Sequence, residues 1–288
     1  MNIGAPGYVM HVESLWLGAA AAAAVLAVFA YLYVAAGPVW AWLAATRLGE
    51  EAAYVVAAIL VYAAVDPELG VLLMASILVD AAANLVAKYS LRLPRPPRGE
   101  WLAPAEGPGF PSGHTQVSAG FWTVLALWWR RLAPLAATVV ALVAASRVAL
   151  HVHYPVDVAG GLLLGVAVGW AVWRFAPSFT GWRAAWLYVA LAGVYGALYA
   201  WTGVEAALKL AGVSLALASY PLAPRYTPPR GVWRLLVAAV DLAAVGAVLA
   251  GVAAVAGVSA LLYVPGYAAG FAVAIHLPRL VSRGLAGG

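Results

Sequence analysis

Residues 146–157 read Ser-Arg-Val-Ala-Leu-His-Val-His-Tyr-Pro-Val-Asp, and they lie in a chain that is otherwise largely apolar. Two further polar clusters precede them, Lys88-Tyr-Ser-Leu-Arg-Leu-Pro-Arg-Pro96 and Pro111-Ser-Gly-His114. Together the three clusters offer three cations, two histidines, a carboxylate and a Ser-Gly turn. This set of groups suits a site that binds phosphate and that holds a nucleophile and an acid.

The composition around these clusters indicates a membrane protein. Of the 288 residues, 65% are hydrophobic and 9% are charged, and the mean hydropathy is +0.92. Soluble domains average about a quarter charged residues, so a soluble enzyme is excluded. The chain has no cysteine, which excludes a disulfide framework and a thiolate zinc site. The net charge of +5 comes from arginines scattered between apolar runs, so we expect no nucleic-acid partner.

The apolar runs predict an all-α fold, a polytopic membrane helix bundle. We expect a phosphatase core of six helices in residues 1–177 and about four extra transmembrane helices in residues 178–288. Val39–Glu51, with Trp40 and Trp42, is typical of an interfacial segment. The helices expected in the core are Leu15–Ala36, Ala52–Val65, Val71–Tyr89, Gly113–Trp129, Leu132–Leu150 and Pro155–Phe175. Those expected in the extension are Ala184–Trp201, Ala206–Tyr220, Val232–Ala256 and Val258–His276.

Transfer of a phosphoryl group requires fixed cations and N–H donors around its oxygens. Lys88, Arg95 and Arg147 can supply the cations. Ser112 directly precedes an apolar helix, which makes it a candidate N-cap. The N–H groups of Gly113 and His114 would then point at an anion near the positive end of that helix. This is a phosphate cradle without a Walker motif.

His153 and His114 are candidates for two different roles. Tyr154-Pro155 fits a helix start with proline at the first position. Asp157 comes four residues after His153, close enough to reach its imidazole. The carboxylate can hold one imidazole nitrogen, which leaves the other free to attack phosphorus. His114 is then available to protonate the leaving oxygen and later to activate water.

The spacings Lys-x6-Arg-Pro, Pro-Ser-Gly-His and Ser-Arg-x5-His-x3-Asp resemble the three-part signature of the type 2 phosphatidic acid phosphatase superfamily. That superfamily includes lipid phosphatases, glucose-6-phosphatase and vanadium haloperoxidases. The resemblance covers roughly the first 177 residues and implies a phosphohistidine at His153, with His114 as general acid and Asp157 orienting the nucleophile. The phosphate ligands implied are Lys88, Arg95, Ser112, Gly113 and Arg147, with no metal and no other cofactor.

Other polar residues leave alternatives open. His151 and His153 with Asp157 could form a metal site, but three nearby cations would repel the ion, so we favour local packing or an interface for His151. Asp80 and Asn84 share a helix face with Lys88 and either support it or form a buried hydrogen bond between helices. Asp241, together with Glu205 and Lys209, either shapes a substrate pocket or forms an ion pair.

The leading hypothesis is a membrane phosphatase acting on a lipid phosphate or diphosphate, such as a polyisoprenyl carrier. Its partners would be an amphipathic phosphorylated substrate and the membrane lipid; the sequence makes no prediction of oligomeric state. A phosphatase for sugar phosphates, similar to glucose-6-phosphatase, is the alternative. A catalytically silent lipid-binding or transport protein is less favoured, because a binder has no use for the nucleophile.

The distribution of basic residues predicts which side of the membrane the site faces. On this helix count, nine arginines lie opposite the catalytic side: Arg130, Arg131, Arg174, Arg183, Arg225, Arg230, Arg234, Arg279 and Arg283. Four basic residues not assigned to phosphate lie on the catalytic side: Arg47, Arg92, Arg98 and Lys209. Because basic flanks stay in the cytoplasm, the active site is expected on the extracytoplasmic side.

Overall fold

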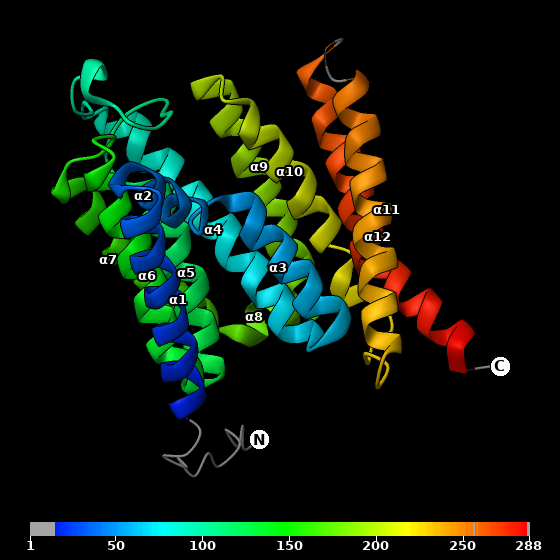
Figure 1. Cartoon of the computed structure of the whole chain (residues 1–288). Coiled ribbons are helices and arrows are strands. Elements are labelled where there is room, and N and C mark those ends of the chain that lie inside the picture. Colours follow the sequence, from blue (N-terminus) through cyan, green and yellow to red (C-terminus); the bar gives the residue numbers. More distant parts are fainter. Residues whose placement is uncertain (1–14, 256, 258, 287–288) are drawn as a thin grey trace.

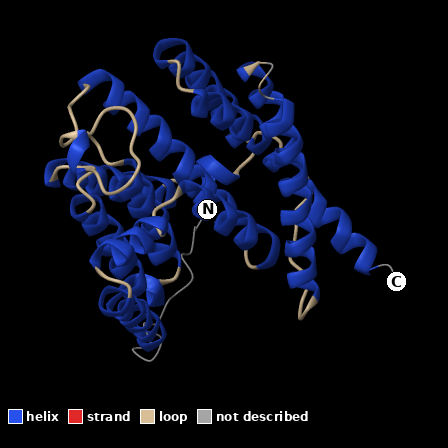
Figure 2. Cartoon of the chain, turned by 45° about the horizontal axis from the view of Figure 1, so that its top comes forward, coloured by secondary structure: helices blue, strands red, loops and turns tan. Residues whose placement is uncertain are grey.

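The computed structural model of the chain describes residues 15–286 apart from 256 and 258, and in this part all regular structure is helical (Figures 1 and 2). The elements of the first 180 residues are α1 (Leu15–Ala35), α2 (Pro38–Arg47), α3 (Glu51–Ala64), α4 (Pro67–Leu91), α5 (Gly113–Trp128), α6 (Ala133–Ala149), α7 (Pro155–Arg174) and α8 (Ala176–Thr180). Four helices follow: α9 (Ala184–Thr202), α10 (Glu205–Leu217), α11 (Trp233–Val255) and α12 (Tyr263–Ala286).

The prediction of a polytopic helix bundle is confirmed. In the described part of the chain, seven helical segments are long and apolar enough to cross a membrane, so the chain is a multi-pass membrane protein. All ten expected helices are present within the described residues, but α3, α5 and α10 are shorter than a full span. The last helix differs most from expectation. It begins at Tyr263 and continues through Pro278, whose carbonyl accepts a hydrogen bond from Ser282 Oγ (2.6 Å). Because proline has no N–H group, the helix lacks one intrahelical hydrogen bond at this position.

Helix α4 is the centre of the bundle, and its local sequence explains where it starts. Asp66 is its N-cap and accepts a hydrogen bond from the Leu69 N–H group (3.1 Å), while Pro67 occupies the first helical position. The helix packs against α3, α5, α7 and α9, and most of it is buried. Its C-terminal end therefore holds Lys88 in a fixed position beside the polar loop.

A row of glycines sets the distance between α5 and α7. Gly161, Gly165 and Gly169 recur every four residues on α7 and face the backbone carbonyls of Ser112, Gln116 and Gly120 on α5. A side chain at any of these three glycines would collide with a carbonyl, so small residues let the two backbones approach closely. This contact positions the N-terminal ends of α5 and α7 next to each other.

The C-terminal helices pack on the core through tyrosine hydroxyls that donate to backbone carbonyls. Tyr226 donates to the carbonyl of Ala63 (2.7 Å), and Tyr62 donates to that of Ile275 in α12 (2.9 Å). Arg279 lies close to this contact and is only 6% exposed, with its guanidinium over the ring of Tyr220. The count of nine flanking arginines therefore included one that the tertiary fold buries.

The interfacial role expected of Val39–Glu51 stays a prediction; most of this segment forms α2, which packs against α1 and α6 and buries Ala41, Ala45 and Thr46. The ion pair considered for Asp241 is not formed among the described residues, whose one acid–base pair is His153 with Asp157. Lys209 instead lies over the ring of Tyr263, 4.5 Å from its centroid.

Candidate active site

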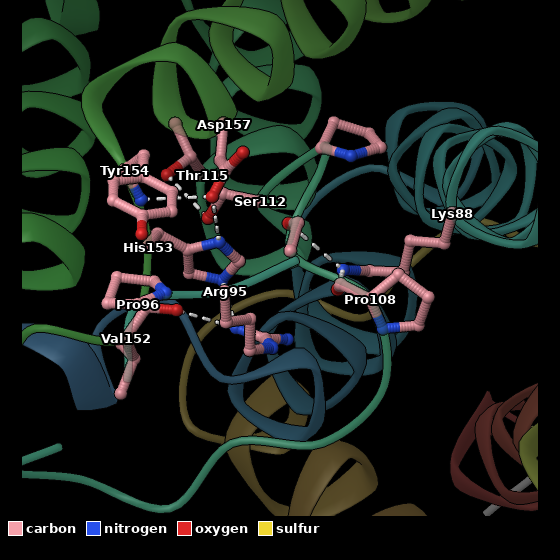
Figure 3. A network of polar contacts seen from close by, with 12 residues as sticks. Lys88, Arg95, Pro96, Pro108, Ser112, Thr115, Val152, His153, Tyr154 and Asp157 are labelled. Carbon is pink, nitrogen blue, oxygen red and sulfur yellow. Dashed lines mark hydrogen bonds and ion pairs between the residues drawn. The ribbon is translucent and has the colours of Figure 1, made fainter. Parts of the chain in front are cut away.

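The three polar clusters meet at one end of the bundle, above the N-terminal ends of α5 and α7 (Figure 3). Hydrogen bonds join the loop after α4 to the turn between α6 and α7 and to the first turn of α7. Leu102 N–H donates to the carbonyl of Leu150 (3.0 Å), and Arg95 Nη1 donates to that of Val152 (2.8 Å). Ser112 N–H donates to the carbonyl of Asp157 (2.9 Å). Loop and turn therefore lie at the same end of the bundle.

His153 and Asp157 form a buried pair, as the sequence predicted. His153 Nδ1 lies 3.2 Å from Asp157 Oδ2, and the two residues are 3% and 1% exposed. The same carboxylate oxygen accepts a hydrogen bond from the N–H group of Tyr154 (2.9 Å), the residue that precedes Pro155 at the start of α7. The carboxylate thus stabilises the helix start and holds Nδ1 as a donor, so that the lone pair lies on Nε2.

Arg95 lies directly against that lone pair. Its Nη1 atom is 2.8 Å from His153 Nε2, and its other nitrogens donate to the carbonyls of Gly107 (2.9 Å) and Glu106 (2.7 Å). Backbone carbonyls therefore fix the guanidinium plane beside the imidazole. An anion bound here would meet the guanidinium and His153 Nε2 at the same point.

Burial and nearby cations keep His153 neutral. Burial, and with it the charges of Arg95, Lys88 and Arg147, lower its pKa from 6.5 to about 4, although the hydrogen bond to Asp157 raises it. A neutral imidazole has a lone pair that can attack phosphorus. At neutral pH this histidine is therefore in the form that nucleophilic catalysis needs.

Lys88 and Arg147 approach the site from α4 and α6. The Lys88 ammonium group donates to the carbonyls of Pro108 (2.7 Å) and Gly109 (3.4 Å), which tie the loop to the end of α4. Arg147 is 3% exposed and donates through Nη1 to the hydroxyl of Thr46 on α2. The Nε group of Arg147 has no partner among the described residues, so a donor remains for an anion.

The Pro-Ser-Gly-His turn starts α5, as predicted, although the cap differs from expectation. Ser112 occupies the N-cap, but its hydroxyl lies 3.1 Å from Thr115 Oγ1 and does not cap a backbone N–H group. The N–H groups of Gly113 and His114 belong to the first helical turn, where no intrahelical acceptor exists. Burial, and after it the charges of Arg147, His153, Arg95 and Lys88, lower the pKa of His114 from 6.5 to about 3, so its imidazole is neutral at neutral pH until an anion binds beside it.

Two residues that hold site residues in place, Thr46 and Gln116, lie outside the three sequence motifs. Gln116 accepts a hydrogen bond from Asn84 Nδ2 (2.9 Å) and donates to Asp80 Oδ1 (3.2 Å). Asn84 also donates to the carbonyl of Pro111 (3.3 Å) and thereby supports the turn. Asp80 serves the buried helix–helix contact instead. A sequence signal existed for Gln116, since a polar residue one turn into an apolar helix needs a partner; none existed for Thr46.

The possible metal ligands do not converge in the described part of the chain, where no three His, Asp or Glu residues come together. His151 has a positive φ of 56° and an exposed side chain, so the packing role considered for it is wrong. An interface role for His151 remains a prediction.

Comparisons with known proteins agree with this geometry. Residues 69–180, which include all three polar clusters, match the model of the PAP2 superfamily. This segment is thus similar to the PAP2 superfamily. Glucose-6-phosphatase 3 of Mus musculus is 34% identical over 112 residues, covering 32% of this chain and 32% of the relative. The chain thus matches about a third of that relative's length, and no solved structure matches. The resemblance inferred from the motifs is confirmed.

Proposed function

We propose that the protein is a membrane phosphatase that hydrolyses a lipid phosphate or diphosphate through a phosphohistidine. The observation that carries the proposal is the His153–Asp157 pair with Arg95 against the other imidazole nitrogen, Nε2. The PAP2 match and the relative named as a glucose-6-phosphatase support phosphatase activity. A buried, neutral, oriented histidine surrounded by three cations is suited to attack on phosphorus rather than to anion binding alone.

The proposed reaction has two steps. His153 Nε2 attacks phosphorus while the bond from phosphorus to the leaving oxygen breaks, and His114, which takes up a proton when the phosphate anion binds beside it, gives that proton to the leaving oxygen. Asp157 stabilises the positive charge on the phosphorylated imidazole. In the second step His114 takes a proton from water, whose oxygen attacks phosphorus, and the bond from phosphorus to Nε2 breaks. Lys88, Arg95, Arg147 and the N–H groups after Ser112 would hold the phosphate oxygens in both steps.

A sugar phosphate is the alternative substrate, because the curated relative is named for glucose 6-phosphate. We favour a lipid, since the site lies at helix ends, where a phosphate head group sits beside its own hydrocarbon tail. Phosphate release by detergent-purified protein from a polyprenyl phosphate, a polyprenyl diphosphate and glucose 6-phosphate will separate the two. His153→Ala should remove all turnover and all acid-labile phosphate bound to protein, whereas normal turnover by this variant would contradict the mechanism.

The proposed chemistry uses protein cations in place of a metal. Activity should therefore survive chelation, and vanadate should inhibit, since it can adopt the five-coordinate geometry of in-line transfer. Loss of activity in a chelator and its recovery with a divalent ion would show instead that a metal participates.

We further propose that the site opens to the extracytoplasmic side. Without the buried Arg279, eight arginines still lie opposite the site against four unassigned basic residues on its side. Arg131 packs against Gly18 near the start of α1, far from the catalytic loops. Single cysteines at Glu106 and Arg131 test this: an impermeant thiol reagent should label only the Glu106 position in intact cells, and labelling of only the Arg131 position would reverse the orientation.

A further inference from the structure

An apolar groove runs along the membrane-facing side of the core between α1, α2 and α6. Its volume is about 340 Å³, within the range of ligand sites. It opens sideways, because Val28 of α1 is 60% exposed and Leu48 is 41% exposed. The residues that line it are Ala24, Val25, Val28, Phe29, Leu32, Ala44, Ala45, Leu48 and Leu142.

The upper end of this α1–α2–α6 groove adjoins His114. Leu48 lines the groove and is followed by Gly49, where an added methyl group would lie 3.3 Å from Cβ of His114. On the same helix as the groove residues Ala44 and Ala45, Thr46 binds Arg147. The helix that walls the groove is therefore also attached to the phosphate site.

The chemistry of the reaction determines which side of the site the leaving group occupies. In-line transfer places the leaving oxygen opposite the attacking nitrogen of His153. His114 protonates that oxygen, so the organic group attached to it must lie on the His114 side. The α1–α2–α6 groove begins at that side and descends along α1, from Leu32 to Ala24, into the apolar part of the bundle.

We propose that the α1–α2–α6 groove holds the hydrocarbon chain of the substrate, which makes the substrate a long-chain lipid phosphate and not a sugar phosphate. This inference rests on the proposed function and deepens it. The α1–α2–α6 groove begins beside His114 and is apolar. A sugar would bind there poorly, because its hydroxyl groups would lose their hydrogen bonds to water.

A second apolar hollow provides a control. It lies between α5, α6 and α7, has a volume of about 400 Å³, and includes Ala137 and Ala141 of α6 together with Leu162 of α7. Its lining residue nearest to His114 in the sequence is Ala119, five positions further along α5, whereas the α1–α2–α6 groove reaches Leu48, next to Gly49 at the His114 side chain. By volume alone the two hollows are similar, and only the direction of in-line departure selects the α1–α2–α6 groove.

Filling each hollow in turn tests the proposal. Val28→Trp combined with Ala44→Phe fills the α1–α2–α6 groove. Ala137→Phe combined with Ala141→Phe fills the second hollow. The four side chains that are replaced are all exposed, so the core stays intact. The readout is kcat/KM for a long-chain prenyl monophosphate divided by kcat/KM for phenyl phosphate. We expect the first pair to lower this ratio at least about tenfold, because several methylene contacts are lost, and the second pair to leave it unchanged. An unchanged ratio in the first pair, or an equal fall in both, would overturn the proposal.

Photo-crosslinking separates failure of the groove from failure of the proposed function. An alkyl monophosphate with a diazirine near the end of its chain should label residues 24–32 and 44–48 in the wild-type protein, whether or not phosphate is released. Labelling there without turnover of any phosphate would refute the phosphatase and keep the groove. Labelling of residues 133–144, or of neither segment, would refute the groove.

Discussion

Asp157 and Asp241 are equally buried, at 1% and 0% exposed, but their surroundings are opposite. Asp157 contacts the imidazole of His153 and the N–H group of Tyr154 at the start of α7. Neither oxygen of Asp241, which lies inside the apolar helix α11, has a hydrogen-bond partner among the described residues. Hydrogen-bond donors and a helix N-terminus stabilise a negative charge on Asp157, and Asp241 has neither of these in the part of the chain that the structure describes. Burial of a carboxyl group is thus not by itself a sign of catalysis; its partners are.

The largest effect expected from this comparison is that of Asp157→Asn. An amide in place of the carboxylate cannot stabilise the imidazolium that forms, so kcat should fall by about 10⁴-fold while the protein still folds. The matched variant Asp241→Asn should keep wild-type kcat. Phosphate release by both purified variants measures this, and equal losses would remove the distinction between the two aspartates.

His114→Ala should have a smaller effect that depends on the leaving group. Loss of a general acid costs about 10²–10⁴-fold for an alcohol leaving group. The loss should be much less for p-nitrophenyl phosphate, whose leaving group needs no proton. The two substrates are compared at one pH, and equal losses on both would show that His114 acts by positioning and not by proton transfer.

The protonation of His153 gives a third test. Because its folded-state pKa is lowered to about 4, the neutral nucleophile is present above that pH and is lost only as the pH falls through about 4. Nitrogen-15 NMR of histidine-labelled protein, with the His153 signal identified by its absence in His153→Ala, reports the titration. In Asp157→Asn the midpoint should move lower still, since the hydrogen bond to Asp157 raises this pKa. A wild-type midpoint near 6.5 would contradict the burial argument.

The smallest effect is expected for the stability of Asp241→Leu. This change removes two unpartnered oxygens and supplies an apolar side chain of similar size. We expect the free energy of unfolding to be unchanged or higher by about 1 kcal/mol. Thermal unfolding in detergent of Asp241→Leu, with Asp157→Leu for contrast, measures it. A large destabilisation by Asp241→Leu would mean that the carboxyl group has a partner or ligand in the membrane.

Much of the site follows from local spacing. Tyr154-Pro155 fixes the start of α7, and a helix that starts there brings Asp157 back to His153 whatever lies elsewhere in the chain. Ser112 before Gly113 likewise fixes the start of α5. Asp66-Pro67 similarly defines the beginning of α4, although the apolar pattern alone placed that start at Val71.

The sequence by itself determined the membrane bundle, the helix starts and the identities of the groups gathered for phosphate, because hydropathy, helix caps and i,i+4 spacing act within a few residues. Only the tertiary structure decided that Arg95 lies on the lone pair of His153, that Thr46 holds Arg147 and that Arg279 is buried. Thr46 and Arg147 are 101 positions apart, and Arg95 and His153 are 58 apart. Such contacts depend on how helices pack, and close packing is set by shape across several helices at once, which no local pattern records.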